Sequence, residues 1–230
     1  MVKGKFWRQR HPGINYQMIR FSLFAGSLLA CLIGVAPAYS QEGSARAQLE
    51  RFSEELRTLQ ASFEQQVIST DGAVQDKSSG EVWLMRPGLF RWEYGGDFPE
   101  KVIADGANIW IYDEVLEQVT VKNQSEAALN SPLALLTDLG RLDSQFEVRE
   151  AGEIDQLSLL ELRSRAAESD FERILLGLAD DVLQLMIMED AFGLRTEIRF
   201  QQVISNPELD PLLFTFTPPE SADVIGEIQR

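Results

Sequence analysis

Apolar and polar residues alternate with a two-residue period along most of the chain after its first sixty residues. This period is typical of strands that bury one face. It predicts strands at 62–69, 80–85, 89–94, 101–105, 108–113, 117–122, 145–149, 157–163, 172–178, 182–189, 194–203 and 213–217. Turn signals separate several of them at hairpin spacing: Asp71-Gly72, Gly95-Gly96, Asp105-Gly106, Asp180-Asp181 and Phe192-Gly193.

Two segments have a helical pattern instead. Residues 44–60 carry apolar side chains at steps of three and four, which predicts an amphipathic helix: Leu49, Phe52, Leu56 and Leu59. Pro132 is a suitable first-turn residue for a second helix that ends near Asp138. We therefore predict a mainly β protein with a few α-helices, in which a strongly curved antiparallel sheet forms an incomplete barrel closed on one side by helices.

Large apolar residues are frequent at the alternating positions. The pattern predicts that the following residues line or back a concave face: Trp83, Phe90 or Trp92, Trp110, Tyr112, Leu157, Leu159, Met186 and Met188. Such a face is either the packed core of an ordinary domain or the wall of a cavity for an apolar ligand. The alternation alone leaves both interpretations open.

Residues 81–94 place one arginine inside a run of aromatic residues. The strand pattern on both sides is interrupted by Arg86-Pro87-Gly88, which predicts a strand, a corner and a second strand. A guanidinium always carries five donors, so a buried Arg86 needs carbonyl or carboxylate partners. A solvated turn arginine is the alternative.

The first residues have the pattern of an export signal. A basic start precedes an apolar run at 21–35, and Ala36-Pro37-Ala38 fits a small-residue cleavage site. We therefore expect residues 1–38 to be a signal peptide, with cleavage after Ser40 also possible, and residues 41–230 to form one domain. The residues that end in Cys31 also resemble a lipobox, which would make the protein lipid-anchored.

Composition narrows the chemistry of the mature chain. The full sequence has 21 basic and 36 acidic residues, and the leader holds five of the basic ones, which leaves a net charge of −20. This charge argues against nucleic acid and anionic lipid as partners. The only histidine and the only cysteine, His11 and Cys31, lie in the leader. We therefore expect no metal, no cofactor and no enzymatic activity.

Four motifs in order resemble one known family. Trp83, Arg86, Pro87, Phe90 and Trp92 form a W-x-x-R-P-x-x-F-x-W pattern that is similar to the signature of the LolA family, the periplasmic carriers of lipoproteins to the bacterial outer membrane. Residues 105–118 resemble the family's next hairpin, residues 131–136 its lid helix, and residues 214–219 its last strand. The resemblance covers nearly all of the chain after the leader.

The resemblance implies an incomplete barrel that receives acyl chains beneath a helical lid. It implies that Arg86 is a latch whose donors reach carbonyls of the helix near Pro132. It also implies a set of apolar ligand-binding residues: Trp83, Phe90, Trp92, Leu133, Leu135 and Leu136.

The implied partners are acylated lipoproteins as cargo, an inner-membrane lipoprotein-releasing transporter as donor and an outer-membrane receptor as acceptor. The carrier itself is expected to be a periplasmic monomer. Two alternatives remain: a lipid-anchored outer-membrane receptor of the same architecture, supported by Cys31, and a hydrolase that pairs Asp105 with Asp113 or Glu93.

Overall fold

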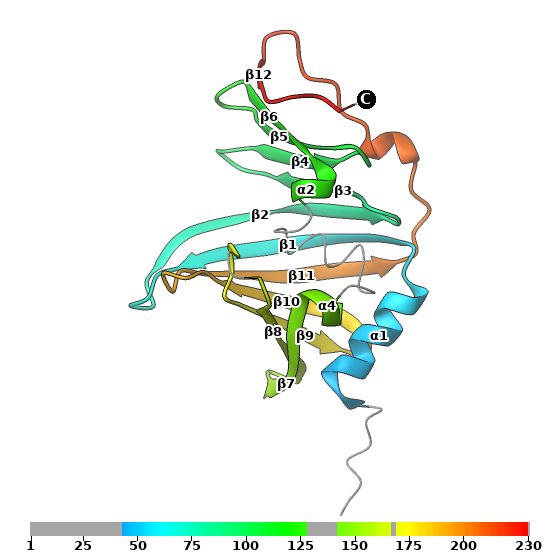
Figure 1. Ribbon diagram of the computed structural model, residues 1–230, viewed down its shortest axis with the longest axis vertical. Helices are drawn as coiled ribbons and strands as arrows, with labels where there is room; N and C mark the ends of the chain where they lie inside the picture. Colours follow the sequence, from blue (N-terminus) through cyan, green and yellow to red (C-terminus); the bar gives the residue numbers. More distant parts are fainter. Residues whose placement is uncertain (1–42, 128–141, 167–168, 230) are drawn as a thin grey trace, which may run out of the picture. The chain divides into compact units, whose positions relative to one another are not determined.

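The computed structural model describes residues 43–127, 142–166 and 169–229, which form one curved, open sheet of twelve strands with few helices (Figure 1). The order across the sheet is β12-β6-β5-β4-β3-β2-β1-β11-β10-β9-β8-β7. All neighbours are antiparallel except β12, which runs parallel to β6. The strands are β1 (Thr58–Ile68), β2 (Val74–Met85), β3 (Leu89–Tyr94), β4 (Glu100–Ala104), β5 (Asn108–Asp113), β6 (Gln118–Asn123), β7 (Phe146–Ile154), β8 (Leu157–Ser164), β9 (Arg173–Ala179), β10 (Val182–Glu189), β11 (Arg195–Ser205) and β12 (Asp223–Ile225).

Most predicted strands are confirmed, and three have the predicted bounds, β3, β5 and β10. The predicted turns are confirmed as well. Gly72, Gly96, Gly106 and Gly193 have positive φ angles, and Asp180 and Asp181 share this conformation between β9 and β10. Glycine and aspartate tolerate the left-handed region better than most residues, which is why these turn signals locate the hairpins.

Helix α1 (Ala45–Glu55) covers one face of the sheet, which we call the inner face; the opposite face is the outer face. Figure 1 shows α1 beside β9 and β10. Ser44 caps the helix by accepting a hydrogen bond from the Ala47 N–H, 3.1 Å away. Leu49 and Phe52 are buried against the inner face, as their helical spacing predicts.

The predicted helix was too long at its C-terminal end. It ends at Glu55, and β1 begins at Thr58. Leu59 continues the apolar spacing of the helix, yet it is a strand residue that is buried in the same core. The apolar periodicity could not distinguish a helix from a strand at Leu59, because both conformations place its side chain on the inner face.

The alternating apolar residues divide between the two faces. Trp92, Phe90, Met186 and Met188 lie on the inner face, as cross-strand pairing and their common neighbours show. Trp83 pairs with Arg91, so it points to the outer face. Four other residues of the predicted concave face are also on the outer face: Trp110, Tyr112, Leu157 and Leu159.

The predicted last strand at 213–217 is wrong. Residues Pro211–Phe214 form the 3-10 helix η3, which Asp210 caps at its N-terminus. The orange and red segment in Figure 1 then passes over the outer face, where Phe216 contacts Trp110 and Tyr112, each with ring centroids 5.7 Å apart. The alternating aromatic residues at 213–217 therefore reflect the packing of an extended segment on the sheet rather than strand pairing. The last strand in the described part of the chain is β12.

Two short helices flank the region of the predicted lid: α2 (Gln124–Ala127) and α4 (Leu142–Gln145). The predicted helix at 132–138 lies outside the described residues. None of the helices in the described part of the chain is long and apolar enough to cross a membrane.

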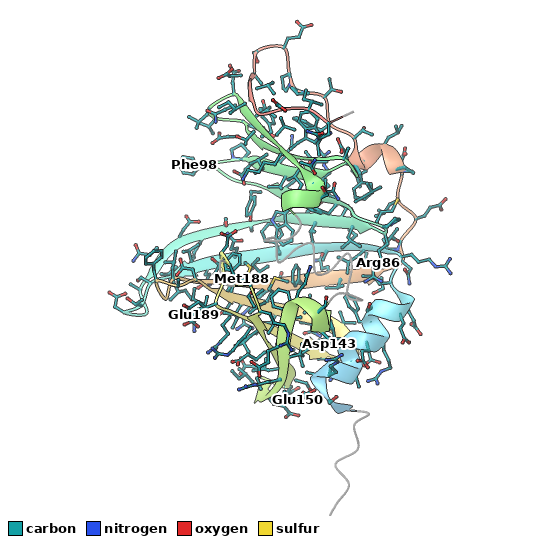
Figure 2. The ribbon with its side chains drawn as sticks, in the orientation of Figure 1. Arg86, Phe98, Asp143, Glu150, Met188 and Glu189 are labelled. Atoms are coloured by element: carbon teal, nitrogen blue, oxygen red, sulfur yellow. The ribbon has the colours of Figure 1, made fainter. Side chains whose placement is uncertain are left out.

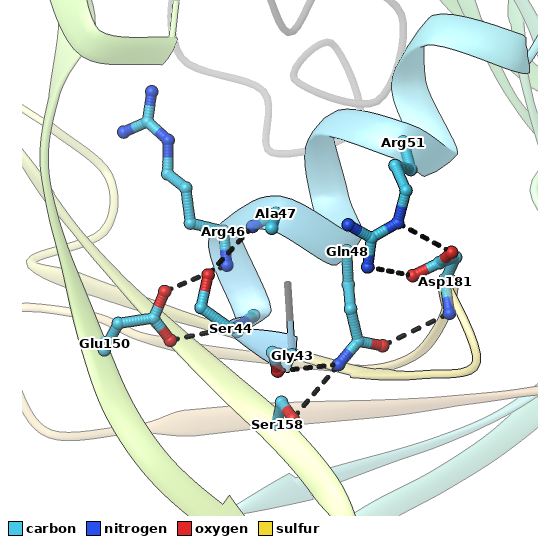
Figure 3. Close-up of polar contacts among 10 residues, drawn as sticks. Gly43, Ser44, Arg46, Ala47, Gln48, Arg51, Glu150, Ser158 and Asp181 are labelled. Carbon is cyan, nitrogen blue, oxygen red and sulfur yellow. Dashed lines mark hydrogen bonds and ion pairs between the residues drawn. The ribbon is translucent and has the colours of Figure 1, made fainter. Parts of the chain in front are cut away.

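Glu150 of β7 holds the N-terminal end of α1 (Figure 3). Its two carboxylate oxygens accept hydrogen bonds from the backbone N–H groups of Ala45 and Arg46, both at 3.0 Å. The first N–H groups of a helix have no partner inside the helix, and a carboxylate there is also favoured by the helix dipole. The edge strand thus fixes where α1 begins.

A second set of polar contacts joins α1 to the β9–β10 turn (Figure 3). The side chain of Gln48 donates to the Ser158 hydroxyl at 3.1 Å and accepts from the Asp181 N–H at 3.2 Å. Arg51 forms a two-point ion pair with the Asp181 carboxylate, at 2.7 and 2.8 Å. These contacts orient the helix over the inner face.

We predict that Glu150→Ala lowers the free energy of unfolding by about 1 to 2 kcal/mol, because two helix N–H groups lose a charged acceptor. Glu153→Ala on the same strand is the matched control, since Glu153 is exposed and outside this contact. Urea unfolding of both variants measures the difference. Equal stability of the two variants would show that Glu150 does not anchor α1.

Candidate functional site

An aromatic cluster occupies the middle of the inner face. Trp92 and Phe63 have ring centroids 4.4 Å apart, and Tyr94 and Phe200 contact this pair edge-on. The strands β1, β3 and β11 bring these side chains together because their registers place them on one face: Phe63 lies opposite Phe200. The inner face is therefore a continuous surface of aromatic and aliphatic groups.

Helix α1 packs tightly on part of this surface. A cavity of about 10 Å³ remains between Phe52 of the helix, the C-cap residue Leu56, and Leu84 and Phe200 of the sheet, and only apolar residues line it. This is roughly the room that one water molecule needs. An acyl chain can enter here only if α1 moves away from the sheet.

Trp92 carries a polar group within this apolar surface. Its side chain is 1 % exposed, and its indole N–H interacts with the hydroxyl of the neighbouring Tyr94, although no acceptor among the described residues is placed for a well-formed hydrogen bond. The neighbouring Tyr94 hydroxyl donates to the side-chain oxygen of Gln65 at 3.1 Å. Burial, and then the negative charge of Glu100, raise the pKa of Tyr94 to about 12.

Beyond Tyr94 the inner face becomes polar. A groove of about 620 Å³ lies at this end, between β2 and the β3–β4 turn. Glu100 pairs with both Tyr94 and Asp113 across the strands, so both carboxylates face the groove beside the tyrosine. Burial and the charge of Asp113 raise the pKa of Glu100 above its usual range.

Arg86 lies at the opposite end of β3, in the corner that the sequence predicts. Its Nη1 donates to the Ser53 carbonyl at 2.6 Å, and its Nη2 donates to the Ser53 hydroxyl at 3.3 Å. Arg86 thus contacts the last turn of α1. Its expected contact with the helix near Pro132 involves residues outside those described and stays a prediction.

The other predicted site residues have different positions. Phe90 is buried on the inner face with Ala104 and Ile109. Trp92 is central to that face, whereas Trp83 is on the outer face. The apolar residues of the predicted lid lie outside the described residues: Leu133, Leu135 and Leu136. Sequence reasoning missed the groove and Tyr94, although alternation with Trp92 places Tyr94 on the same face.

The carboxylates of the hydrolase alternative have structural partners. Asp105 accepts hydrogen bonds from the Trp110 indole at 2.6 Å and from the Asn108 N–H at 2.7 Å. Burial opposes ionisation of Asp105, but the hydrogen bonds outweigh it and hold its pKa below the usual range, the reverse of what a general acid needs. Asp113 accepts from two backbone N–H groups of the following turn, and Glu93 pairs with Arg91.

The described residues contain no group of three or more histidine, cysteine, aspartate or glutamate side chains placed to hold a metal ion. The site is therefore described by two features of one sheet face: an apolar aromatic surface that α1 partly covers, and a polar, acidic groove next to it. Such a combination is typical of proteins that bind amphipathic molecules.

Comparison with known proteins identifies the family. The profile of the family "Outer membrane lipoprotein carrier protein LolA" matches residues 54–217. An outer-membrane lipoprotein carrier protein from Dechloromonas aromatica is 38% identical over 209 residues, which cover 91% of this chain and 100% of the relative. One from Alkalilimnicola ehrlichii is 37% identical over 204 residues, which cover 88% and 94% of the two chains. The chain belongs to the LolA family.

A solved structure shares the fold. A crystal structure of an uncharacterized conserved protein from Thermus thermophilus aligns with a TM-score of 0.53 at 16% identity, covering 79% of this chain and 98% of that chain. At this identity the likeness concerns the fold alone. The predicted fold, a curved antiparallel sheet with few helices, is confirmed.

We predict that Glu100→Gln raises the free energy of unfolding at neutral pH by about 0.5 kcal/mol, a value reduced for the solvent exposure of this pair. A raised folded-state pKa means that the wild-type protein loses stability as the pH rises through that pKa. The glutamine variant lacks this loss. The difference in the free energy of unfolding between the variant and the wild type should therefore vanish at a pH below the ordinary glutamate pKa of about 4.3. Urea unfolding at both pH values measures it, and a difference of the same size in acid would contradict the assignment.

Proposed function

We propose that this chain is a periplasmic chaperone that carries lipoproteins from the inner membrane to an outer-membrane receptor, holding their acyl chains on the inner face. The aromatic and aliphatic surface around Trp92, Phe63 and Phe200 is the observation that carries this proposal. Its relatives bear the name outer-membrane lipoprotein carrier protein over nearly their whole length. No covalent bond is made or broken in such a function.

The balance of burial energies supports reversible capture. Burying an acyl chain contributes about 0.8 kcal/mol per CH₂ group, so half-burial of one ordinary chain gives on the order of 6 kcal/mol. The helix α1 packs directly on the inner face when no ligand is bound, so cargo has to displace those apolar contacts. The cost of opening offsets part of the gain and keeps the cargo transferable.

Arg86 is the proposed latch of the closed form. Its hydrogen bonds to Ser53 hold the last turn of α1 against the corner between β2 and β3. The proposed ligand-binding residues are Phe90 and Trp92 with the three lid leucines, Leu133, Leu135 and Leu136, whereas Trp83 lies on the outer face, away from the proposed acyl site. Of these, Phe90 and Trp92 have the inner-face position that acyl binding requires.

The proposed route has a donor and an acceptor. An inner-membrane lipoprotein-releasing transporter loads the carrier, and an outer-membrane receptor with higher affinity accepts the acyl chains. The carrier is proposed to act as a monomer, after removal of its leader. The names of its relatives favour a carrier over a lipid-anchored receptor, and the structural roles of Asp105, Asp113 and Glu93 favour a carrier over a hydrolase.

The position of the acyl chain can be tested by fluorescence quenching. We predict that a fatty acid brominated along its chain quenches the tryptophan fluorescence of the protein, because bromine quenches on contact. The quenching should be largely lost in Trp92→Phe, whose indole was on the inner face, and retained in Trp110→Phe, whose indole was on the outer face.

The two variants are a matched pair because each replaces one buried tryptophan with a smaller aromatic residue. Circular dichroism and urea unfolding establish that both remain folded. Loss of quenching in Trp110→Phe alone would place the ligand on the outer face, and no binding of the fatty acid by the wild-type protein would refute the proposed function.

We predict that Arg86→Leu destabilises the closed, empty protein by about 1.5 to 3 kcal/mol, the usual contribution of hydrogen bonds from a charged donor. This change favours the open form that holds cargo. Capture from the inner membrane should continue while delivery fails, so lipoproteins accumulate on the carrier. Mass spectrometry of the variant purified from the periplasm measures the accumulated cargo.

Arg57→Leu is the control for this variant, because Arg57 is exposed and close in sequence to the helix that Arg86 contacts. It should leave stability within about 0.5 kcal/mol of the wild type and leave delivery intact. If the Arg86→Leu variant delivers lipoproteins as well as the wild type does, Arg86 is not a latch and has an ordinary structural role.

A further inference from the structure

The polar groove continues the inner face rather than forming a separate site. Along β3, Trp92 belongs to the apolar surface, and Tyr94, two residues later on the same face, lines the groove. Glu100 and Asp113 follow across the sheet in register with Tyr94. A molecule that lies on the apolar surface and extends past Tyr94 therefore enters the groove.

The groove has an excess of acidic groups. Four carboxylates and one ammonium group line it: Asp76, Asp97, Glu100, Asp113 and Lys77. Two of these carboxylates, Glu100 and Asp113, face each other directly across neighbouring strands, an arrangement that destabilises a sheet through like-charge repulsion. A cation placed between them would remove this repulsion.

One polar group at the inner side of the groove also lacks a partner. The hydroxyl oxygen of Ser78 lines the groove, is fully buried, and has no hydrogen-bond partner among the described residues. Buried polar groups usually have a partner, and those that lack one can be completed by a ligand.

We propose that this groove binds the first polypeptide residues of the acylated cargo, with a lysine or arginine side chain between Glu100 and Asp113. The inference rests on the proposed function, since the acyl chain must lie on the inner face to bring the polypeptide to the groove. Phe98, 80 % exposed on the β3–β4 turn, offers an apolar contact at the rim (Figure 2).

The charge of the groove also selects against other occupants. An anionic lipid surface would be repelled by the same carboxylates. A polypeptide segment with an acidic residue next to its acyl group would meet Glu100 and Asp113 unfavourably. The groove thus provides specificity through charge, while the apolar surface provides most of the affinity.

Three acylated peptides that differ in one side chain test the proposal: dodecanoyl-Gly-Gly-Lys amide and the same compound with Gln or Glu in place of Lys. Their affinities for the mature wild-type protein are measured by calorimetry at low and at physiological salt. We expect the Lys peptide to bind about tenfold more tightly than the Gln peptide, and the Glu peptide to bind most weakly. The preference should decrease with salt.

The variant Glu100→Gln/Asp113→Asn should reduce the ratio of the Lys and Gln affinities to about twofold or less, since it removes both charges. Glu208→Gln/Glu220→Gln is the charge-matched control, because Glu208 and Glu220 are exposed carboxylates outside the groove. It should keep the wild-type ratio. This control separates a local site from the general attraction of an acidic protein for cations.

The outcomes distinguish failure of the cation site from failure of acyl binding. Equal affinities of the three peptides for the wild type, or a ratio that Glu100→Gln/Asp113→Asn leaves unchanged, would overturn the cation site while leaving acyl binding in place. If none of the three peptides binds, the proposed acyl-binding function itself fails. A ratio lost in Glu100→Gln/Asp113→Asn and kept in Glu208→Gln/Glu220→Gln supports the site.

Discussion

The apolar inner face of the sheet is the constraint on which the rest of the structure depends. Twelve strands in one open sheet expose two faces, and each face carries large apolar side chains that must be covered. The C-terminal segment covers part of the outer face through Phe214 and Phe216. Helix α1 covers part of the inner face. The difference between the two covering segments matters for ligand binding, because a covered face can bind a ligand only if the segment on it can move away.

The position of α1 depends on polar contacts as much as on burial. Glu150 binds its first turn, Asp181 binds Arg51 in its middle, and Arg86 binds Ser53 near its C-terminal end. Hydrophobic burial has no direction, so it does not by itself determine where a helix lies on an apolar surface. Hydrogen bonds are directional, so they determine the position of the helix. Each of them can be broken at a cost of only a few kcal/mol. A cover held this way suits a carrier that must both capture and release.

Much of the fold could be predicted from the sequence, because strands and turns have characteristic local sequence patterns. The alternation located β3 and β10, and the corner at Arg86 followed from the Pro87-Gly88 break. The errors occurred where two conformations bury the same residue. Leu59 fits a helix and a strand equally well, and the aromatic pattern around Phe214 fits a strand and an extended segment packed on a sheet. Local pattern reports which side chains are buried, not what they are buried against.

The sequence by itself therefore determined the class of fold, the family and the candidate residues on β3, because these depend on period, turn chemistry and motif order. Only the tertiary structure decided which face each aromatic residue occupies, since Trp83 and Trp92 reach opposite faces through strand register. It also brought Glu100 and Asp113 together beside Tyr94, although no single sequence motif contains all three residues. Register and pairing are properties of the whole sheet, and no single segment encodes them.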